Sequence, residues 1–386
     1  MFDRLALARL TALAQRFPAV VILGARQVGK TTLARGAFPN LPYLDCEDPT
    51  SAASLREDAR LVLAAREQGG LIIDEAQAVA GVLPAVRGLI DERRTLTGRF
   101  VILGSAQPAL VRSVAESLAG RAAVIELSPL TAGEARSGEN PIDWRTLWLK
   151  GGFPDALRGD FREWWEAYLR LVLERDLPQY GVSADPVFMR RLLTMLAHSQ
   201  GGLLNASQLG ASLGVSYHTV QRYLTVLEQI FLLRPLRPYF RNLGKRLVKA
   251  PKTYLRDTGL VHHLLNISSE EQLLSHPVRG SSWETFVIED VLRREQLQHP
   301  GSHAYFWRTV AGAEIDLVIE RGGDERIGIE VKTARGDHPR TVRALEEALG
   351  DIDAQRGWIV DQQPGIDRVS ARVARGGFGD LLTGSP

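Results

Sequence analysis

Apolar residues in the first third of the chain occur in short continuous runs, separated by longer stretches with helical spacing. The predicted strands cover residues 19–23, 43–45, 70–73, 99–105 and 122–127. A short run that is apolar throughout is typical of a strand buried on both faces, and strands that alternate with helices form a parallel sheet with helices on both sides. The pattern therefore predicts an α/β core over residues 1–135.

The pattern changes after residue 135. Residues 136–200 are mainly helical, with helices predicted at 161–175 and 187–198. Residues 201–267 contain a short helix, a glycine turn, a second helix at 217–229 and strand-like runs at 231–238 and 247–255. Residues 275–386 combine a helix from residue 282 with strands at 304–308, 314–319 and 326–332. The chain thus divides into four predicted segments, 1–135, 136–200, 201–267 and 275–386.

The segment after the first predicted strand has the spacing of a phosphate-binding loop. Glycines let the backbone N–H groups point at phosphate oxygens, Lys30 reaches the β- and γ-phosphates, and the Thr31 hydroxyl ligates Mg²⁺. A plain turn between strand and helix would not need Lys30 and Thr31. The predicted nucleotide-binding residues of this loop are Gly24, Ala25, Arg26, Gln27, Val28, Gly29, Lys30, Thr31 and Thr32.

Three further positions fit nucleotide hydrolysis. Asp74 and Glu75 end a buried apolar run, where Asp74 would help to bind Mg²⁺ and Glu75 would orient the attacking water. Ser105, with Gln107 close by, ends the next strand and is predicted to sense the γ-phosphate, with an ordinary strand-end turn as the alternative. Arg121 is predicted to act on the nucleotide of a neighbouring subunit, with a surface arginine after a helix-ending glycine as the alternative.

The strings GARQVGKTT, LIIDEAQ, VILGSAQ and SLAGR, in this order, resemble the AAA superfamily. More narrowly, they resemble a group of bacterial and archaeal ATPases that carry a C-terminal domain of uncharacterised function with a restriction-endonuclease-like core. The resemblance extends from about residue 18 to about residue 334. It implies ATP as the nucleotide and assembly into a homo-oligomer, of which a ring is one form. The helical segment 136–200 follows the sheet as a small lid domain would, and Mg²⁺ is expected with the ATP.

Residues 204–229 have the pattern of a helix-turn-helix, with Ser216 as N-cap of the second helix, and the following strands and basic tip complete a winged helix. The start of the second helix is where recognition helices contact bases, and basic residues of the hairpin would contact phosphates. The alternative is a module for protein interaction or packing. The predicted DNA contacts are Tyr217, His218, Thr219, Gln221, Arg222, Arg241, Lys245, Arg246, Lys249 and Lys252.

The last segment places Asp316, Glu330 and Lys332 on two neighbouring strands, after a helix that bears Glu284. Glu330 and Lys332 share one face of a strand because side chains alternate. This string is similar to the PD-(D/E)XK nucleases. The resemblance implies Mg²⁺ bound by Glu284, Asp316 and Glu330, with Lys332 assisting the reaction. The alternatives are a salt-bridged surface hairpin and a nuclease fold that only binds DNA or protein.

Composition adds little. The net charge is +2, which permits nucleic acid as a partner without requiring it, and Cys46 is the single cysteine, which indicates a reducing cytoplasm. No apolar run approaches the roughly 20 residues that span a bilayer.

The sequence predicts an ATP-hydrolysing, DNA-processing motor with a metal-dependent nuclease-like domain. The alternative is a nucleotide-dependent switch without cleavage, and sequence-specific transcription regulation is a weaker third hypothesis.

Overall fold

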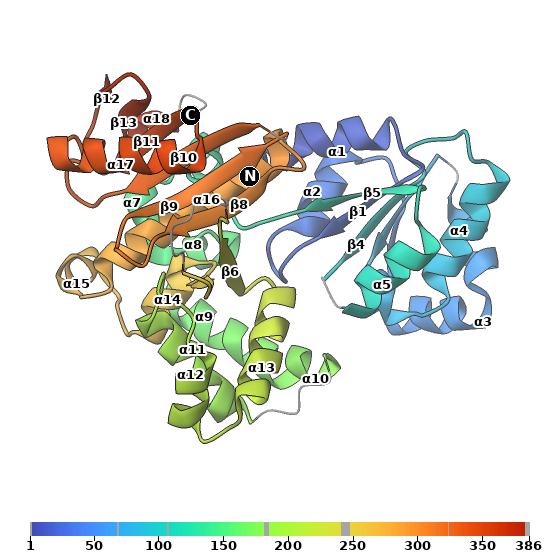
Figure 1. Cartoon of the computed structure of the whole chain (residues 1–386). Helices are drawn as coiled ribbons and strands as arrows, with labels where there is room; N and C mark the ends of the chain where they lie inside the picture. Colours follow the sequence, from blue (N-terminus) through green and yellow to red (C-terminus); the bar gives the residue numbers. More distant parts are fainter. Residues whose placement is uncertain are drawn as a thin grey trace. The chain divides into compact units, whose positions relative to one another are not determined.

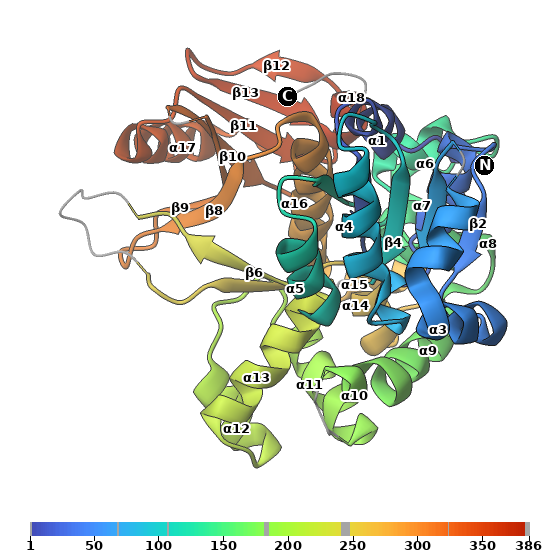
Figure 2. The ribbon, with the colours of Figure 1, turned by 90° about the vertical axis from the view of Figure 1, so that its right-hand side faces the viewer.

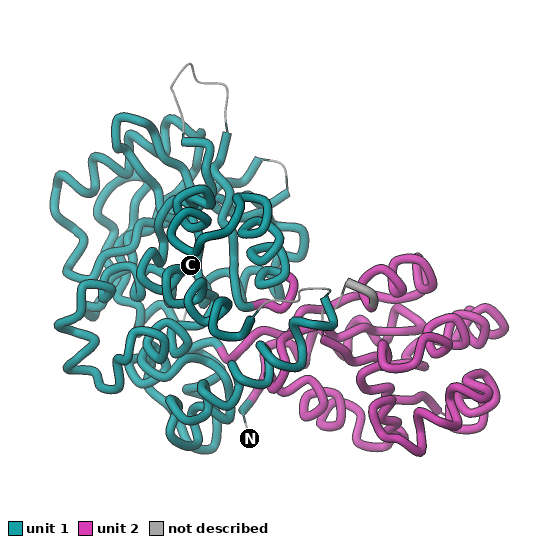
Figure 3. The backbone as a smooth tube through the Cα atoms, turned by 90° about the horizontal axis from the view of Figure 1, so that it is seen from below, with its two compact units in different colours: residues 1–2, 131–228, 232–386 teal, residues 3–130, 229–231 magenta. Residues whose placement is uncertain are grey.

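The computed structural model describes residues 2–67, 69–105, 108–180, 185–240, 248–322 and 324–382. The chain forms two compact units (Figure 3). Unit 2 contains residues 3–130 and 229–231, and unit 1 contains Phe2 and residues 131–228 and 232–386. The three segments that the sequence predicts after residue 135 therefore belong to one compact unit.

Unit 2 contains a parallel sheet with the strand order β2-β3-β4-β1-β5 among the described residues. Its strands are β1 (Ala19–Leu23), β2 (Tyr43–Asp45), β3 (Leu71–Asp74), β4 (Phe100–Gly104) and β5 (Ala122–Glu126). β4 lies between β1 and β3, so the loops after these three strands meet at the same edge of the sheet.

Helices cover both faces of this sheet, as the apolar runs predicted (Figure 1). The helical elements of unit 2 are α1 (Ala6–Ala14), α2 (Lys30–Ala37), α3 (Pro49–Arg66), the 3₁₀ turn η1 (Ala76–Ala78), α4 (Val82–Glu92) and α5 (Pro108–Ser117). Strand residues such as Ile73 and Ile102 pack with Val86 and Ile90 of α4 in one hydrophobic core. The predicted α/β core is confirmed.

Unit 1 begins with a group of helices. They are α6 (Ala132–Ser137), α7 (Trp144–Lys150), α8 (Pro154–Arg158), α9 (Phe161–Leu171), α10 (Leu177–Gln179) and α11 (Pro186–His198). The helix predicted at 161–175 ends as an α-helix at Leu171 and continues as the π-helical turn η2 (Val172–Asp176). Trp165 and Tyr168 of α9 are buried; Trp165 packs edge-on against both Tyr168 and Phe153, and Tyr168 packs at a tilt against Phe153.

The next two helices are α12 (Ala206–Leu213) and α13 (Tyr217–Gln229). Gly214 ends α12 with a φ of 72°, which lets the chain reverse, and the Thr219 N–H donates to the Ser216 hydroxyl at 3.1 Å at the start of α13. Val220, Leu224 and Leu227 lie on the buried face of α13, as their spacing predicted.

The remaining strands form a second sheet with the order β12-β13-β11-β10-β9-β8-β6-β7 among the described residues (Figure 2). They are β6 (Leu233–Pro238), β7 (Lys252–Leu255), β8 (His303–Arg308), β9 (Glu314–Arg321), β10 (Glu325–Val331), β11 (Arg356–Asp361), β12 (Ile366–Arg368) and β13 (Val373–Gly377). The helices that follow β7 are α14 (Thr258–Leu264), α15 (Glu270–Ser275), α16 (Arg279–Gln298), α17 (Pro339–Ile352) and α18 (Phe378–Leu381).

The hairpin that the sequence assigned to a winged helix is part of this sheet. β6 and β7 pair antiparallel, and β6 also pairs in parallel with β8, with Arg237 opposite Tyr305. The second strand of the hairpin begins at Lys252, later than the predicted start at residue 247. The hairpin therefore extends the C-terminal sheet, and the helix pair α12–α13 is joined to that sheet through β6.

A buried network connects the helical group to α16. Ser282 donates its hydroxyl hydrogen to His262 Nε2 at 2.7 Å and accepts from the Trp148 indole N–H at 3.0 Å. His262 Nδ1 lies 2.8 Å from the carbonyl oxygen of Leu149, so the neutral ring carries its proton on Nδ1. Burial lowers the pKa of His262 to about 4.

No helix in the described part of the chain combines the length and the apolar character that a membrane crossing needs.

Candidate nucleotide site and acidic cluster

The loop between β1 and α2 has a shape that depends on its two glycines. A Cβ atom on Gly24 would lie 2.4 Å from the carbonyl oxygen of Leu127, so a larger residue would force the backbone to move. Gly29 has a φ of 95°, which glycine adopts without strain. Gln27 is exposed and also has a positive φ, at 58°.

Lys30 is the first residue of α2 and is almost fully buried. Its ammonium donates to the carbonyl oxygens of Gly24, at 3.1 Å, and Ala25, at 3.0 Å. These carbonyls hold a positive charge at the loop, next to the N-terminus of α2. A helix N-terminus and a lysine together form a site that is suited to phosphate.

The remaining predicted loop residues differ in their exposure. Arg26 is partly buried, with Nη2 3.6 Å from Glu47 Oε1. Val28 is fully buried, and Thr32 is exposed on α2.

Thr31 and Asp74 lie in direct contact. The Thr31 hydroxyl donates to Asp74 Oδ2 at 2.6 Å, and the Tyr43 hydroxyl donates to the same oxygen at 2.8 Å. A hydroxyl and a carboxylate side by side are oxygen ligands of the kind that Mg²⁺ prefers, so these residues fit the predicted metal. Burial and the hydrogen bond to Asp74 raise the pKa of Tyr43, so its proton stays on the oxygen. Tyr43 was not predicted as a site residue from the sequence.

The carboxylate of Glu75 is held in place by Gln77. Its backbone has φ 47° and ψ 47°, a left-handed conformation that non-glycine residues adopt rarely. The amide of Gln77, in the η1 turn, donates to the Glu75 carboxylate and lies 3.3 Å from the Ser105 hydroxyl. Gln77 therefore connects the acid after β3 with the residue after β4. Its position in the string LIIDEAQ was the signal that could have identified it.

Arg121 lies away from these groups. Its Nε and Nη2 donate to Asp91 Oδ1 and Oδ2, at 2.7 and 2.9 Å. This pair lowers the pKa of Asp91. The role of Arg121 in a neighbouring subunit stays a prediction, and it would require this exposed ion pair to open. Gln107 lies outside the described residues.

Unit 1 contains an acidic cluster that is built around a lysine. The Lys252 ammonium lies 3.0 Å from Glu284 Oε1, 2.6 Å from Glu314 Oε1 and 3.4 Å from Asp316 Oδ1. The Lys252 side chain is only 4% exposed. Lys252 was predicted to contact DNA, but the structure places its buried ammonium against carboxylates of α16 and β9 and not on the surface.

Two further groups donate to the cluster. The Tyr254 hydroxyl donates at 2.6 Å to Glu284 Oε1, the oxygen that also contacts Lys252, and the Val331 N–H donates to Asp316 Oδ2 at 2.9 Å. Burial and the charge of Asp316 raise the pKa of Glu284, whereas the surrounding carboxylates raise the pKa of Lys252 against the opposing effect of its burial. Neither Lys252 nor Glu314 was predicted from the sequence as a member of this cluster.

Glu330 and Lys332 form a pair beside the cluster. Lys332 Nζ lies 2.5 Å from Glu330 Oε1, on one face of the chain as the alternation predicted, and Glu330 Oε2 has no hydrogen-bond partner among the residues that the structure describes. Burial and the charge of Asp316 raise the pKa of Glu330. Within the described ranges, no three histidine, cysteine, aspartate or glutamate side chains are arranged to hold a metal ion. Lys252 lies among two of the carboxylates predicted to bind Mg²⁺, those of Glu284 and Asp316, and Mg²⁺ binding here stays a prediction.

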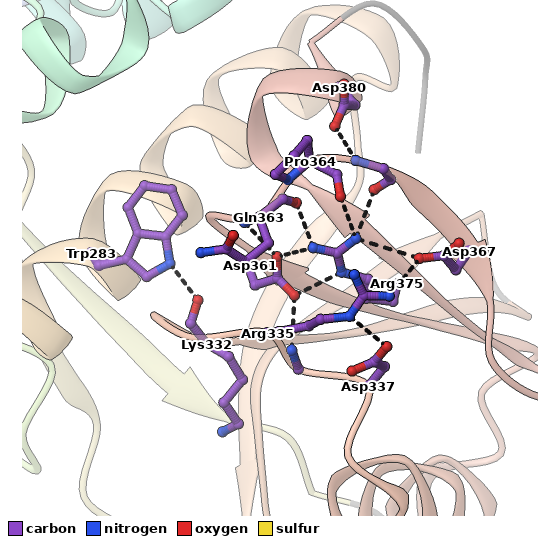
Figure 4. Close-up of polar contacts among 12 residues, drawn as sticks. Trp283, Lys332, Arg335, Asp337, Asp361, Gln363, Pro364, Asp367, Arg375 and Asp380 are labelled. Carbon is purple, nitrogen blue, oxygen red and sulfur yellow. Dashed lines mark hydrogen bonds and ion pairs between the residues drawn. The ribbon is translucent and has the colours of Figure 1, made fainter.

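The segment after β10 is fixed by a second network (Figure 4). Trp283 donates its indole N–H to the Lys332 carbonyl oxygen at 2.9 Å, and Asp361 Oδ2 accepts from the Gly336 N–H at 2.8 Å. Arg375, which is fully buried, donates from Nε to the same Asp361 oxygen at 2.8 Å. The bond from Trp283 holds the backbone of Lys332, whose side chain remains partly exposed, and Asp361 with Arg375 holds the backbone of Gly336.

The start of α13 presents polar side chains to solvent. Tyr217, His218 and Arg222 are exposed, and Thr219 and Gln221 are partly buried. Lys249 is exposed in the segment before β7. The predicted contacts Arg241, Lys245 and Arg246 lie outside the described residues. The helix therefore offers a polar surface, although Lys252 does not contribute to it.

Known sequence families match three stretches of the chain. Residues 16–136 match an AAA domain, residues 142–271 match a domain of unknown function (DUF8612), and residues 279–373 match another domain of unknown function (DUF4143). Unit 2 is thus a P-loop ATPase domain of the AAA type, as its sequence and parallel sheet predicted. The matches do not identify the C-terminal domain as a nuclease.

The chain is 41% identical, over 362 residues, to uncharacterized protein Rv2008c of Mycobacterium tuberculosis and to uncharacterized protein Mb2031c of Mycobacterium bovis. Each comparison covers 92% of this chain and 79% of the relative. The chain belongs to the family of these mycobacterial proteins. Among solved structures, the Walker-type ATPase PABY2304 of Pyrococcus abyssi is similar at 18% identity and a TM-score of 0.47, over 69% of this chain and 96% of that one.

Proposed function

We propose that this chain is an ATP-hydrolysing molecular switch that binds DNA through α13 and does not cut it. The proposal of ATP hydrolysis is supported above all by the hydrogen bond between Thr31 and Asp74, which brings together the two oxygen ligands expected for Mg²⁺ beside Lys30. When bound, Mg²⁺ would neutralise charge on the phosphates.

The residues of unit 2 would have separate roles in ATP binding and hydrolysis. Lys30 and the N–H groups at the start of α2 would bind the β- and γ-phosphates. Glu75, held by Gln77, would accept a proton from the attacking water. Ser105 is in contact with Gln77, so a change at the γ-phosphate would be transmitted to the group that positions Glu75.

DNA is the proposed partner of unit 1. Support comes from the helix pair α12–α13, in which the exposed residues Tyr217, His218 and Arg222 occupy the start of the second helix. Metal-dependent cleavage is the hypothesis that the geometry supports less well, because Lys252 lies among the carboxylates that would bind the metal. Action in a homo-oligomer, with Arg121 reaching a neighbouring subunit, remains part of the proposal.

ATP turnover tests the first half of the proposal. We expect Lys30→Ala to abolish ATP binding, and Glu75→Gln to bind ATP while hydrolysing it about 100-fold more slowly. Glu57→Gln, at an exposed position of α3, is the control and should match the wild type. Equal turnover in all four proteins would refute the assignment.

Fluorescence anisotropy with labelled duplex DNA tests the second half. Binding should weaken as salt rises, and Arg222→Ala should weaken it and reduce the salt slope by about 1. Arg162→Ala, at an exposed position of α9, is the matched control. If no DNA is bound with ATP, with ADP or without nucleotide, unit 1 serves another partner. Cleavage of the same duplex with Mg²⁺ present would instead favour the nuclease.

A further inference from the structure

Lys252 occupies the centre of the acidic cluster in unit 1. It comes from β7, whereas Glu284 comes from α16 and Glu314 and Asp316 come from β9. A lysine ammonium has three N–H donors and no acceptor, and here three carboxylate oxygens lie within 3.4 Å of it. The number of donors therefore equals the number of acidic partners.

The surroundings favour the charged form of this lysine. The Phe306 ring centroid lies 5.7 Å from the ammonium, which adds the attraction of an aromatic face. Isolated burial would favour loss of the proton, but opposite charges at this distance reverse that effect. The three carboxylates therefore stabilise the charged form of the buried Lys252 side chain in this site.

A divalent ion would compete directly with this ammonium. Two of the carboxylate oxygens that it would need, on Glu284 and Asp316, already accept from Lys252. The second oxygen of Asp316 accepts from the Val331 backbone N–H, and the second oxygen of Glu314 lies 3.6 Å from Arg308 Nη1. A metal ion at this place would stand beside a like charge in a low-dielectric environment, where repulsion is strong.

We propose that Lys252 is the built-in cation of this cluster, which replaces a divalent metal and joins the β6–β7 hairpin to α16 and β9. Lys252 therefore takes the place of the metal ion, and the site has no nuclease activity. This inference is independent of the ATPase site in unit 2, because every residue in it belongs to unit 1.

Mn²⁺ binding to the nucleotide-free full chain tests the proposal. The variants are Glu284→Gln, Lys252→Met, and Lys252→Met combined with Asp316→Asn, with Lys249→Met as the matched control at an exposed lysine of the same segment. Calorimetry measures Mn²⁺ affinity. Tryptophan fluorescence during heating measures the stability of unit 1 alone, since all seven tryptophans lie in it.

We expect the wild type and Lys249→Met to bind Mn²⁺ no better than Glu284→Gln. Lys252→Met should gain a Mn²⁺ site at least tenfold tighter, and Mn²⁺ should raise its unfolding midpoint. The added Asp316→Asn should remove both gains.

Two results would overturn the proposal. One is a Mn²⁺ site in the wild type that Glu284→Gln removes, and the other is a folded Lys252→Met that gains no affinity for Mn²⁺. If Lys252→Met does not fold, the comparison of wild type with Glu284→Gln decides the question by itself.

Discussion

Tyr43 donates a hydrogen bond to Asp74 Oδ2, the same oxygen that accepts from Thr31. Tyr43 lies on β2, which pairs with β3, so this bond connects the edge of the sheet with the proposed Mg²⁺ site. The carboxylate is thus oriented from two sides. This geometry gives Tyr43 a role that its place in a short strand did not indicate.

Removing the hydroxyl should weaken the use of Mg²⁺. A single hydrogen bond contributes about 1 kcal/mol, so we expect Tyr43→Phe to raise the Mg²⁺ concentration needed for half-maximal ATP hydrolysis about fivefold. Tyr217→Phe, which removes an exposed hydroxyl from α13, is the control. An unchanged Mg²⁺ dependence would show that Thr31 orients Asp74 without help.

Gln77 should affect the rate of hydrolysis and not the affinity for ATP. Without its amide, Glu75 loses a hydrogen bond that fixes its carboxylate, and we expect Gln77→Ala to lower kcat about tenfold at unchanged ATP affinity. Ser105→Ala should have a smaller effect, because its contact with Gln77 is longer, at 3.3 Å. Steady-state kinetics with a separate measurement of ATP binding checks this. A loss of ATP affinity in Gln77→Ala would assign the residue to binding instead.

Two glycines at the start of unit 2 should respond in opposite ways to alanine. A Cβ on Gly24 would overlap the carbonyl oxygen of Leu127, and overpacking of this kind costs about 1–3 kcal/mol. We therefore expect Gly24→Ala to lose binding of a fluorescent ATP analogue. At Gly36 in α2, apart from the adjacent residues and the helix backbone, no described atom lies within 4 Å of the corresponding position, so alanine there should stabilise the helix by up to about 1 kcal/mol. Equal behaviour of the two variants would contradict the loop geometry.

His262 should make unit 1 sensitive to acid. Its pKa in the folded chain is about 4, below the ordinary value of about 6.5, so between these values the unfolded chain binds a proton that the folded chain does not. The stabilisation is complete above pH 6.5 and declines as the pH falls toward 4. At pH 5 the loss is about 2 kcal/mol relative to neutral pH.

Urea unfolding at pH 7.5 and pH 5, followed by tryptophan fluorescence, measures this loss. His262→Gln can still donate to the Leu149 carbonyl and accept from Ser282, but it does not titrate, so its stability should depend less on pH. His198→Gln, at an exposed position of α11, should keep the wild-type dependence. The same pH dependence in all three proteins would mean that another group controls the acid sensitivity.

The sequence was sufficient to predict those site residues that lie close together along the chain. Gly24, Lys30 and Thr31 lie within one loop and one helical turn, and Asp74 ends a strand that its apolar residues identify. Local spacing determines such positions. The fold of unit 2 was predictable for the same reason, because a short apolar run followed by a helical stretch specifies one unit of a parallel sheet.

The sequence was insufficient where strands pair over long distances. The basic character of residues 241–252 suggested an exposed hairpin, but β6 pairs with β8, which lies more than sixty residues further along the chain. That pairing turns Lys252 toward Glu284 and Asp316. The role of Gln77 was not predicted for a different reason. Its amide contacts Glu75 where the backbone of Glu75 is left-handed, and the sequence does not indicate that conformation.

The pairing of β6 with β8 also limits how the two parts of unit 1 can be separated in evolution. Residues 142–271 and 279–373 match separate families, yet strands from both lie in one sheet, and Lys252 from the first neutralises acids of the second. A gene that kept the second stretch and lost the first would encode a sheet with an unpaired edge and an uncompensated cluster of negative charge. Selection should therefore pass the two stretches on together, as a single evolutionary unit.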